Sequence, residues 1–217
     1  MGNLGGWGDW IELHRRVWSR IALARTQPSR ADEAWPPNLT GSQPVGEGDE
    51  IYHHVLALGR TAFGVDLAFE RLVGARADFD ALFGFGGDAA LAEAGFRMSS
   101  EMHALFVFAD GFWDHLQPLS HIFPGVPELA RAVSAHELDA DTARKVRDHV
   151  EHLAERVTLG RRKQFGQPMT AETFRRVAGG FDGRMAYYGD ETFDVPAIRD
   201  AVADAADLAR VALLGSL

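Results

Sequence analysis

Six consecutive residues in the chain carry two imidazoles, a guanidinium and two carboxylates: Arg147-Asp148-His149-Val150-Glu151-His152. A histidine that titrates near neutrality can move a proton to or from a ribose 2′-hydroxyl or a leaving oxygen. An arginine can hold the scissile phosphate by bidentate hydrogen bonds and stabilise the extra charge of the transition state. With Arg147 as phosphate clamp and His152 as acid/base, the segment predicts phosphodiester chemistry that needs no metal and no other cofactor.

A helix over about residues 142–157 is expected to position these groups. Its apolar face is a stripe at helical spacing, formed by Val146, Val150, Leu153 and Val157. At about 100° per residue, Arg147 and His152 lie at the two edges of the polar face, with Asp148 between them. Asp148 precedes His152 by one turn, so it can accept an imidazole N–H and fix the tautomer. His149 lies near the core and is interpreted as structural.

The chain is acidic as a whole but basic around this motif. Its 22 Lys and Arg against 31 Asp and Glu give a formal net charge of −9. Residues 144–184 hold ten basic and five acidic residues, a net charge of +5. Affinity for phosphates comes chiefly from Lys and Arg. We therefore predict RNA or phosphate binding by Arg144, Arg156, Arg161, Arg162 and Lys163.

Length and composition exclude several other classes of protein. A chain of 217 residues, 46% hydrophobic, is long enough for one well-formed core or two small ones. No apolar run approaches the roughly 18–20 residues that cross a bilayer, and residues 1–7 lack the pattern of a signal peptide. The absence of cysteine excludes disulfides, thiolate metal sites and cysteine nucleophiles. We expect a cytoplasmic protein with no membrane association.

Apolar periodicity predicts an all-α fold, a four- or five-helix bundle in a single domain over residues 1–217. Residues 1–27 are expected to hold an N-terminal helix, residues 28–49 a loop or linker, and residues 50–217 the bundle. Its longer helices are predicted over about residues 50–77, from Ser99-Ser100 to Pro118, and over 142–157 after an Asp139 or Asp141 cap. A short helix is expected to end at about Ala135, and the last helix to begin at Pro196. A small β-hairpin is predicted near residues 185–195.

The motif and the helix order resemble the HEPN superfamily. In that family the motif is an arginine, four to six residues, then a histidine, often with Asn, Asp or His directly after the arginine. Arg147, Asp148 and His152 match in type and spacing. The resemblance covers roughly residues 50–214 in helix order and is strict over the six motif residues.

This resemblance implies a metal-independent endoribonuclease. HEPN domains commonly form homodimers in which two motif helices line one cleft, and many act in toxin–antitoxin or phage-defence systems. It thus implies an RNA substrate and an antitoxin or neighbouring-gene protein as partner. Ala154 stands where HEPN toxins silenced by nucleotidylation carry tyrosine, so that control is not expected. Inactive HEPN domains also exist, so a non-catalytic dimerisation or partner-binding bundle is the alternative.

Two other interpretations stay open. Nine histidines and the Glu-x-x-His spacing of Glu50 and His53 are compatible with a metal-binding helical bundle. A di-iron site would also need a second Glu-x-x-His, which the sequence lacks, and two more glutamates, for which Glu70 and Glu101 are candidates. Three histidines from separate helices can instead bind zinc or nickel. The third interpretation is partner binding through the tryptophans near the N-terminus. Of these, Trp10 and Trp18 are assigned to the core.

Overall fold

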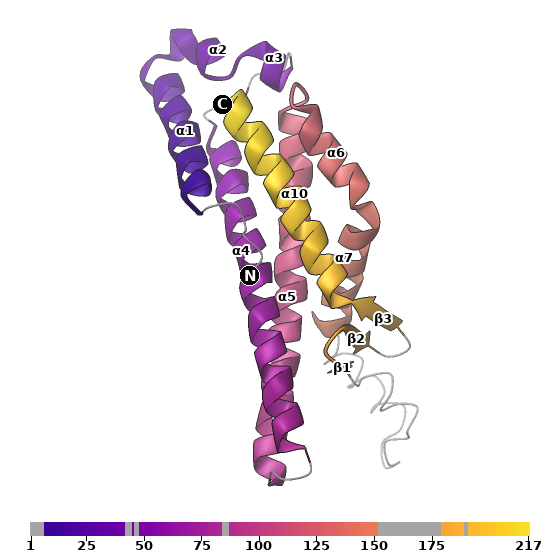
Figure 1. The fold of residues 1–217 in the computed structure, drawn as a ribbon. Helices are drawn as coiled ribbons and strands as arrows, with labels where there is room; N and C mark the ends of the chain where they lie inside the picture. The colour runs from indigo at the N-terminus through magenta and orange to yellow at the C-terminus, as the bar shows by residue number, and fades with distance from the viewer. Residues whose placement is uncertain (1–6, 42–44, 46–47, 84–86, 152–178, 189–190) are drawn as a thin grey trace, which may run out of the picture. The chain divides into compact units, whose positions relative to one another are not determined.

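The computed structural model describes residues 7–41, 45, 48–83, 87–151, 179–188 and 191–217, and for residues 88, 149–151, 179 and 191 the main chain alone. This part of the chain forms helices and one small antiparallel sheet (Figure 1). The predicted all-α helical class with a small hairpin is confirmed. Within these ranges, no helix combines the length and the apolar content needed to cross a membrane.

The chain divides into two compact units. Unit 1 comprises Met1–Phe63, Gly111–Leu138 and Asp200–Leu217, and unit 2 comprises Gly64–Asp110 and Asp139–Arg199. Three long helices contribute residues to both units: α4 (Asp49–Leu82), α5 (Asp88–Ile122) and α10 (Val195–Ser216). The prediction of a single domain over the whole chain stays a prediction.

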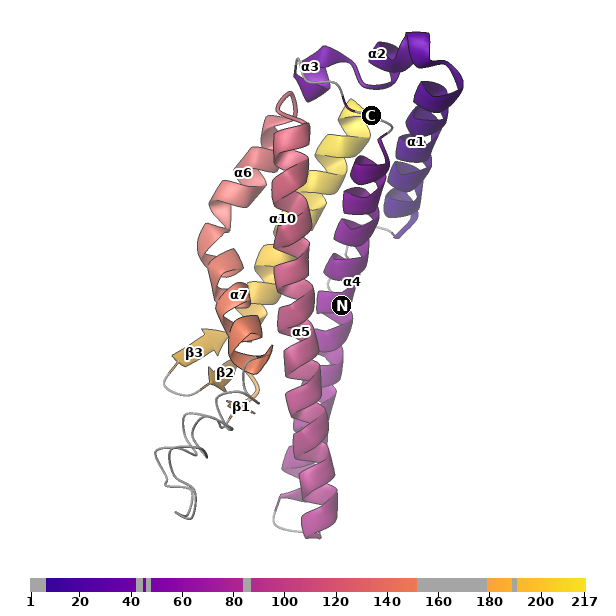
Figure 2. The ribbon, with the colours of Figure 1, turned by 180° about the vertical axis from the view of Figure 1, so that it is seen from behind.

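In unit 1, helix α1 (Trp7–Thr26) packs beside the first part of α4, as Figures 1 and 2 both show. Its buried stripe recurs at steps of three and four residues and consists of Trp10, Leu13, Val17, Ile21 and Ala24. Gly59 of α4 leaves room for the Trp10 ring, because a Cβ at Gly59 would lie 3.1 Å from Trp10 Cε3. The predicted N-terminal helix is confirmed.

The segment predicted as a loop contains short helices, so that prediction is wrong for residues 28–40. They are η1 (Pro28–Arg30), α2 (Ala31–Ala34) and α3 (Pro37–Thr40). Pro28 and Pro37 stand at helix N-termini, where the missing N–H costs no hydrogen bond. Trp35 and Leu39 are buried, and the Gly125 N–H donates to the Leu39 carbonyl at 3.0 Å. Burial of these apolar side chains holds the segment in place.

Helix α5 begins earlier and ends later than its predicted boundaries, Ser99-Ser100 and Pro118. It starts at Asp88 and continues to Ile122, with Pro118 inside it. Residues 89–94 are rich in alanine, the best helix former, so the helix extends past the serines toward its N-terminus. Leu119 is fully buried, so packing outweighs the hydrogen bond lost at Pro118. The following helix, α6 (Pro127–Ala135), ends where predicted.

The small sheet belongs to unit 2 and has the order β1-β2-β3, all antiparallel. The strands are β1 (Gly179–Phe181), β2 (Met185–Tyr188) and β3 (Glu191–Asp194). The predicted hairpin is β2–β3, and β1 is an additional strand. Tyr188 and Phe193 contact the Phe106 ring of α5, at centroid separations of 6.2 and 6.1 Å. These contacts attach the sheet to α5.

A glycine in α4 sets how closely α4 and α5 approach in unit 2. A Cβ on Gly64 would lie 2.6 Å from Cγ of Phe108, whereas one on Gly74 would meet no atom within 4 Å. We expect Gly64→Ala to destabilise the fold by about 1–3 kcal/mol through overpacking. Gly74→Ala should stabilise it by about 0.5–1 kcal/mol, the usual gain inside a helix. Urea unfolding of both variants measures this, and equal effects would contradict the packing described.

Candidate functional site

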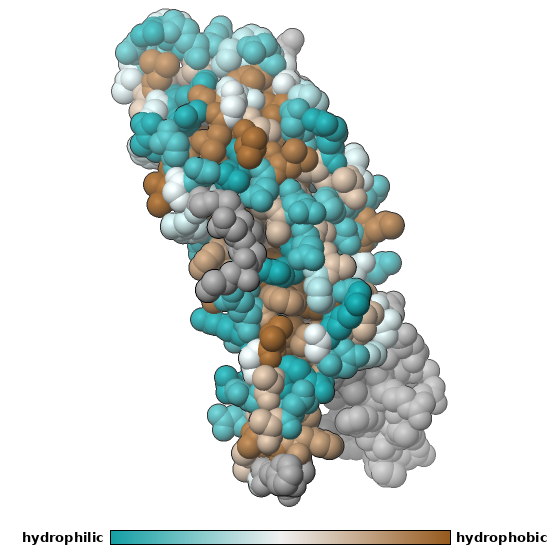
Figure 3. All heavy atoms as spheres, in the orientation of Figure 1, coloured by the Kyte–Doolittle hydropathy of each residue, from teal (hydrophilic) through white to brown (hydrophobic). Residues whose placement is uncertain are grey.

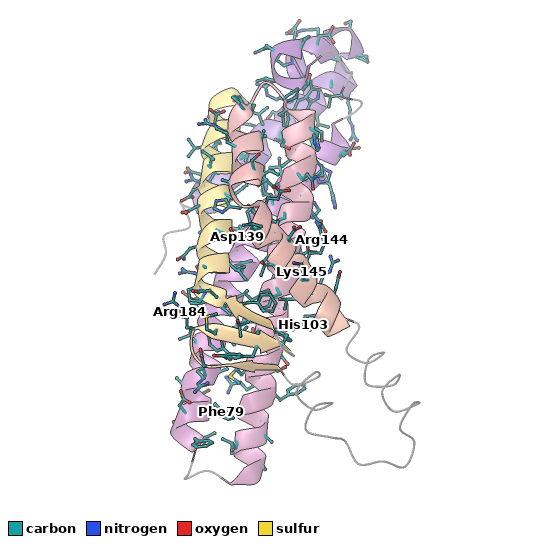
Figure 4. All side chains as sticks on the ribbon, turned by 90° about the vertical axis from the view of Figure 1, so that its right-hand side faces the viewer. Phe79, His103, Asp139, Arg144, Lys145 and Arg184 are labelled. Atoms are coloured by element: carbon teal, nitrogen blue, oxygen red, sulfur yellow. The ribbon has the colours of Figure 1, made fainter. Side chains whose placement is uncertain are left out.

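Helix α7 (Glu137–Glu151) carries the described part of the motif. Ala143 and Val146 are fully buried, and Lys145 is exposed. Figure 4 draws the side chains on the ribbon and labels Arg144 and Lys145 on α7. The predicted apolar position at Val146 is confirmed. The predicted start of this helix is wrong, because α7 begins at Glu137 and the proposed caps, Asp139 and Asp141, lie within it.

A buried carboxylate, Asp110 of α5, anchors this helix. The Asp110 side chain is 1% exposed. Its Oδ2 accepts a hydrogen bond from Nη1 of Arg147, and its Oδ1 lies 3.6 Å from Nε of Arg144. A buried carboxylate is tolerated when cations and hydrogen bonds compensate its lost hydration. Asp110 therefore holds the Arg147 guanidinium by a hydrogen bond and lies within ion-pair distance of the Arg144 guanidinium.

Arg147 also binds its sequence neighbour. Its Nη2 and Nε donate to Oδ1 of Asp148, at 2.9 and 3.3 Å. The Arg147 side chain is 28% exposed, Asp148 is 48% exposed and Arg144 is 45% exposed. One buried and one exposed carboxylate thus lie against one guanidinium.

The structure describes only part of the predicted site. Arg144, Arg147 and Asp148 are brought together on one side of α7. The other predicted residues lie outside the described ranges, namely His152, Arg156, Arg161, Arg162 and Lys163, and the side chain of His149 is not described. The pairing of Arg147 with His152, and that of Asp148 with His152, stay predictions.

Asp110 is the residue that sequence reasoning missed. It lies within the apolar stripe of α5, four residues after Phe106 and three before Trp113, both of which are buried. An acid at such a position needs a basic partner from another element. That signal was present in the sequence, but the identity of the partner was not.

For the alternative metal interpretation, the described ranges offer a histidine cluster but no metal-binding arrangement. His53 and His54 of α4 and His115 of α5 gather in unit 1, with ring centroids 5.3–6.0 Å apart. Glu50 lies 3.8 Å from Nε2 of His54. Across the described ranges, however, no three His, Asp or Glu side chains are placed to hold one metal ion. Glu70 and Glu101, the further candidates for a di-iron site, belong to unit 2.

The tryptophans divide between core and surface. Trp10 and Trp35 are buried, whereas Trp7 and Trp18 are about half exposed. Assigning Trp10 to the core was correct, and assigning Trp18 to the core was wrong, because Trp18 lies outside the buried stripe of α1. Figure 3 shows hydrophobic side chains reaching the surface between hydrophilic ones in the region of α1.

Comparisons with known proteins add no relative to this picture. The chain matches no protein-family model, no curated protein and no solved structure.

Proposed function

We propose that this protein is a HEPN-type, metal-independent endoribonuclease. The observation that most supports the proposal is the pair of partly exposed arginines, Arg144 and Arg147, anchored on buried Asp110. Catalysis of phosphodiester cleavage depends on cations held in place before the charge develops. A guanidinium fixed by a buried carboxylate loses less side-chain freedom on binding a phosphate than one that moves freely in solvent.

The contact with Asp148 suggests where a phosphate would bind. Asp148 accepts hydrogen bonds from Nε and Nη2 of Arg147, the edge with which arginine binds oxyanions in a bidentate manner. Because Asp148 is about half exposed, its side chain can turn away at little cost, whereas Asp110 is buried. An RNA phosphate would take the place of Asp148 on Arg147, while Asp110 keeps the guanidinium oriented.

In this proposal His152 is the acid/base. It takes the proton of a ribose 2′-hydroxyl, the 2′-oxygen attacks phosphorus, and the bond from phosphorus to the 5′-oxygen breaks. The imidazolium so formed gives its proton to the leaving 5′-oxygen, and the other product carries a 2′,3′-cyclic phosphate. Released from Arg147, Asp148 accepts the imidazole N–H of His152 and fixes its tautomer. Arg147 stabilises the negative charge on the transferred phosphorus group.

The biological setting belongs to the same proposal. Two copies of the chain would pair their α7 helices so that Arg147 and His152 of both line one cleft, in a toxin–antitoxin or phage-defence system. An antitoxin or a neighbouring-gene protein would control the activity. If the dimer forms but RNA is bound without cleavage, the protein is a non-catalytic RNA-binding or partner-binding bundle.

Cleavage of a mixed RNA substrate by the purified full chain in EDTA tests the proposal. We expect cleavage that EDTA does not reduce and products that end in a 2′,3′-cyclic phosphate. Arg131→Gln is a matched control, because Arg131 is an exposed arginine of α6 bound to Glu128, in the other unit. Loss of cleavage in EDTA that returns with a divalent metal would contradict the proposed mechanism.

A further inference from the structure

Two histidines that have no role in the proposed nuclease join α4 to α5 in unit 1. Nδ1 of His54 lies 3.0 Å from Nδ1 of His115. Both residues are partly buried, and their ring centroids are 5.3 Å apart at an interplanar angle of 59°. His53 lies beside them, with its centroid 5.7 Å from that of His115 and 6.0 Å from that of His54.

This contact requires one neutral ring to accept. A hydrogen bond between two Nδ1 atoms needs a proton on one of them and a lone pair on the other. If both imidazoles are protonated, both Nδ1 atoms are donors and the hydrogen bond cannot form. Two positively charged rings would then also lie in contact while partly buried, and water would screen their repulsion poorly.

The surroundings favour the neutral forms. Burial is the main cause that lowers the pKa of His54 below its ordinary value of 6.5. The negative charge of Glu50 raises this pKa, and His53 lowers it further. Burial also lowers the pKa of His115, helped by His54 and His53 and opposed by Asp114. From α1, His14 reaches the neighbouring part of α4, where its Nε2 lies 3.3 Å from the Val55 carbonyl oxygen.

We propose that the His54–His115 pair is an acid-sensitive clasp, which joins α4 to α5 at neutral pH and releases when both imidazoles are protonated. The folded-state pKa values lie below the unfolded-state value of about 6.5. The clasp therefore contributes its full stability above about pH 6.5, and that contribution is lost as the pH falls through the folded-state pKa values.

The pH dependence of thermal unfolding tests the clasp. The Tm of the full chain is measured between pH 7.5 and 5.0 at constant ionic strength, for the wild type and for His54→Gln with His115→Gln. Glutamine can both donate and accept across the same gap but does not titrate. We expect the Tm of the wild type to fall by at least about 3 °C more than that of the double variant. His121→Gln, at an exposed histidine of α5, should follow the wild type.

A second measurement keeps the test decisive if the double variant fails to fold. Imidazole NMR of the wild type should give His54 and His115 midpoints below 6.5, and hydrogen exchange should speed up around both residues over the same range. Parallel Tm curves, or ordinary midpoints for both rings, would overturn the clasp. A wild-type titration that shifts when EDTA is added would also overturn it, because it would show a metal ion at the cluster.

Discussion

Replacing His152 with alanine should lower RNA cleavage by about 10²–10⁴-fold, the usual contribution of a general acid/base. The loss should appear in kcat, because the imidazole transfers a proton in the transition state. RNA binding by Arg147 should persist. Single-turnover cleavage of a defined RNA, with binding measured separately, distinguishes a slower chemical step from weaker RNA binding. His149→Ala is the matched control, since it removes a neighbouring imidazole that the helical wheel places near the core.

Two results would remove the catalytic role of His152. One is cleavage in His152→Ala at the wild-type rate, which would point to contamination or to another acid/base. The other is binding of RNA by the wild type without any cleavage, which would favour the non-catalytic bundle. A His149→Ala variant as inactive as His152→Ala, although folded, would show that the wheel assigned the two histidines wrongly.

The second large effect concerns Asp110 and stability. Arg147→Met leaves the Asp110 carboxylate buried without its principal hydrogen-bond donor, and we expect a loss of about 3–5 kcal/mol in the free energy of unfolding. Combining Arg147→Met with Asp110→Leu should recover most of this loss, because an apolar pair needs no compensation. Arg144→Met should cost at most about 1 kcal/mol, since Arg144 is nearly half exposed and 3.6 Å from Asp110. Urea unfolding measures all three.

The same variants separate a structural ion pair from a phosphate clamp. The double variant, Arg147→Met with Asp110→Leu, should be folded yet unable to cleave RNA, because Arg147 no longer contacts phosphate. A folded double variant that cleaves at the wild-type rate would show that Arg147 serves only to neutralise Asp110. That outcome would end the proposed role of Arg147 while leaving the measured stability effects intact.

The sequence by itself determined most of the helical framework. Helix α1 and helix α10 were both predicted, and each buries one apolar stripe, which in α10 consists of Ile198, Val202, Ala205, Ala209 and Leu213. A helix that packs on one face must repeat its apolar residues at 3.6-residue spacing, so the signal is local and readable. The β2–β3 hairpin was predicted for the same reason, since its turn and strands lie within one short segment.

Helix boundaries were predicted less well. Ser99 and Ser100 resemble caps but lie inside α5, and Asp139 and Asp141 lie inside α7. Capping contributes about 1 kcal/mol, so tertiary packing and helix propensity over a longer stretch override it. Packing likewise buries Trp35, within a segment whose composition is typical of a loop.

Only the tertiary structure decided which distant residues meet. Asp110 and Arg147 are 37 positions apart, and His54 and His115 are 61 positions apart. No periodicity relates such residues, because the contact depends on how two helices align along their lengths. The motif made Arg147 a candidate on the basis of residue type and spacing, whereas the fold supplied the buried carboxylate that holds it. For the same reason, the sequence alone could not show that two of the nine histidines share a hydrogen bond.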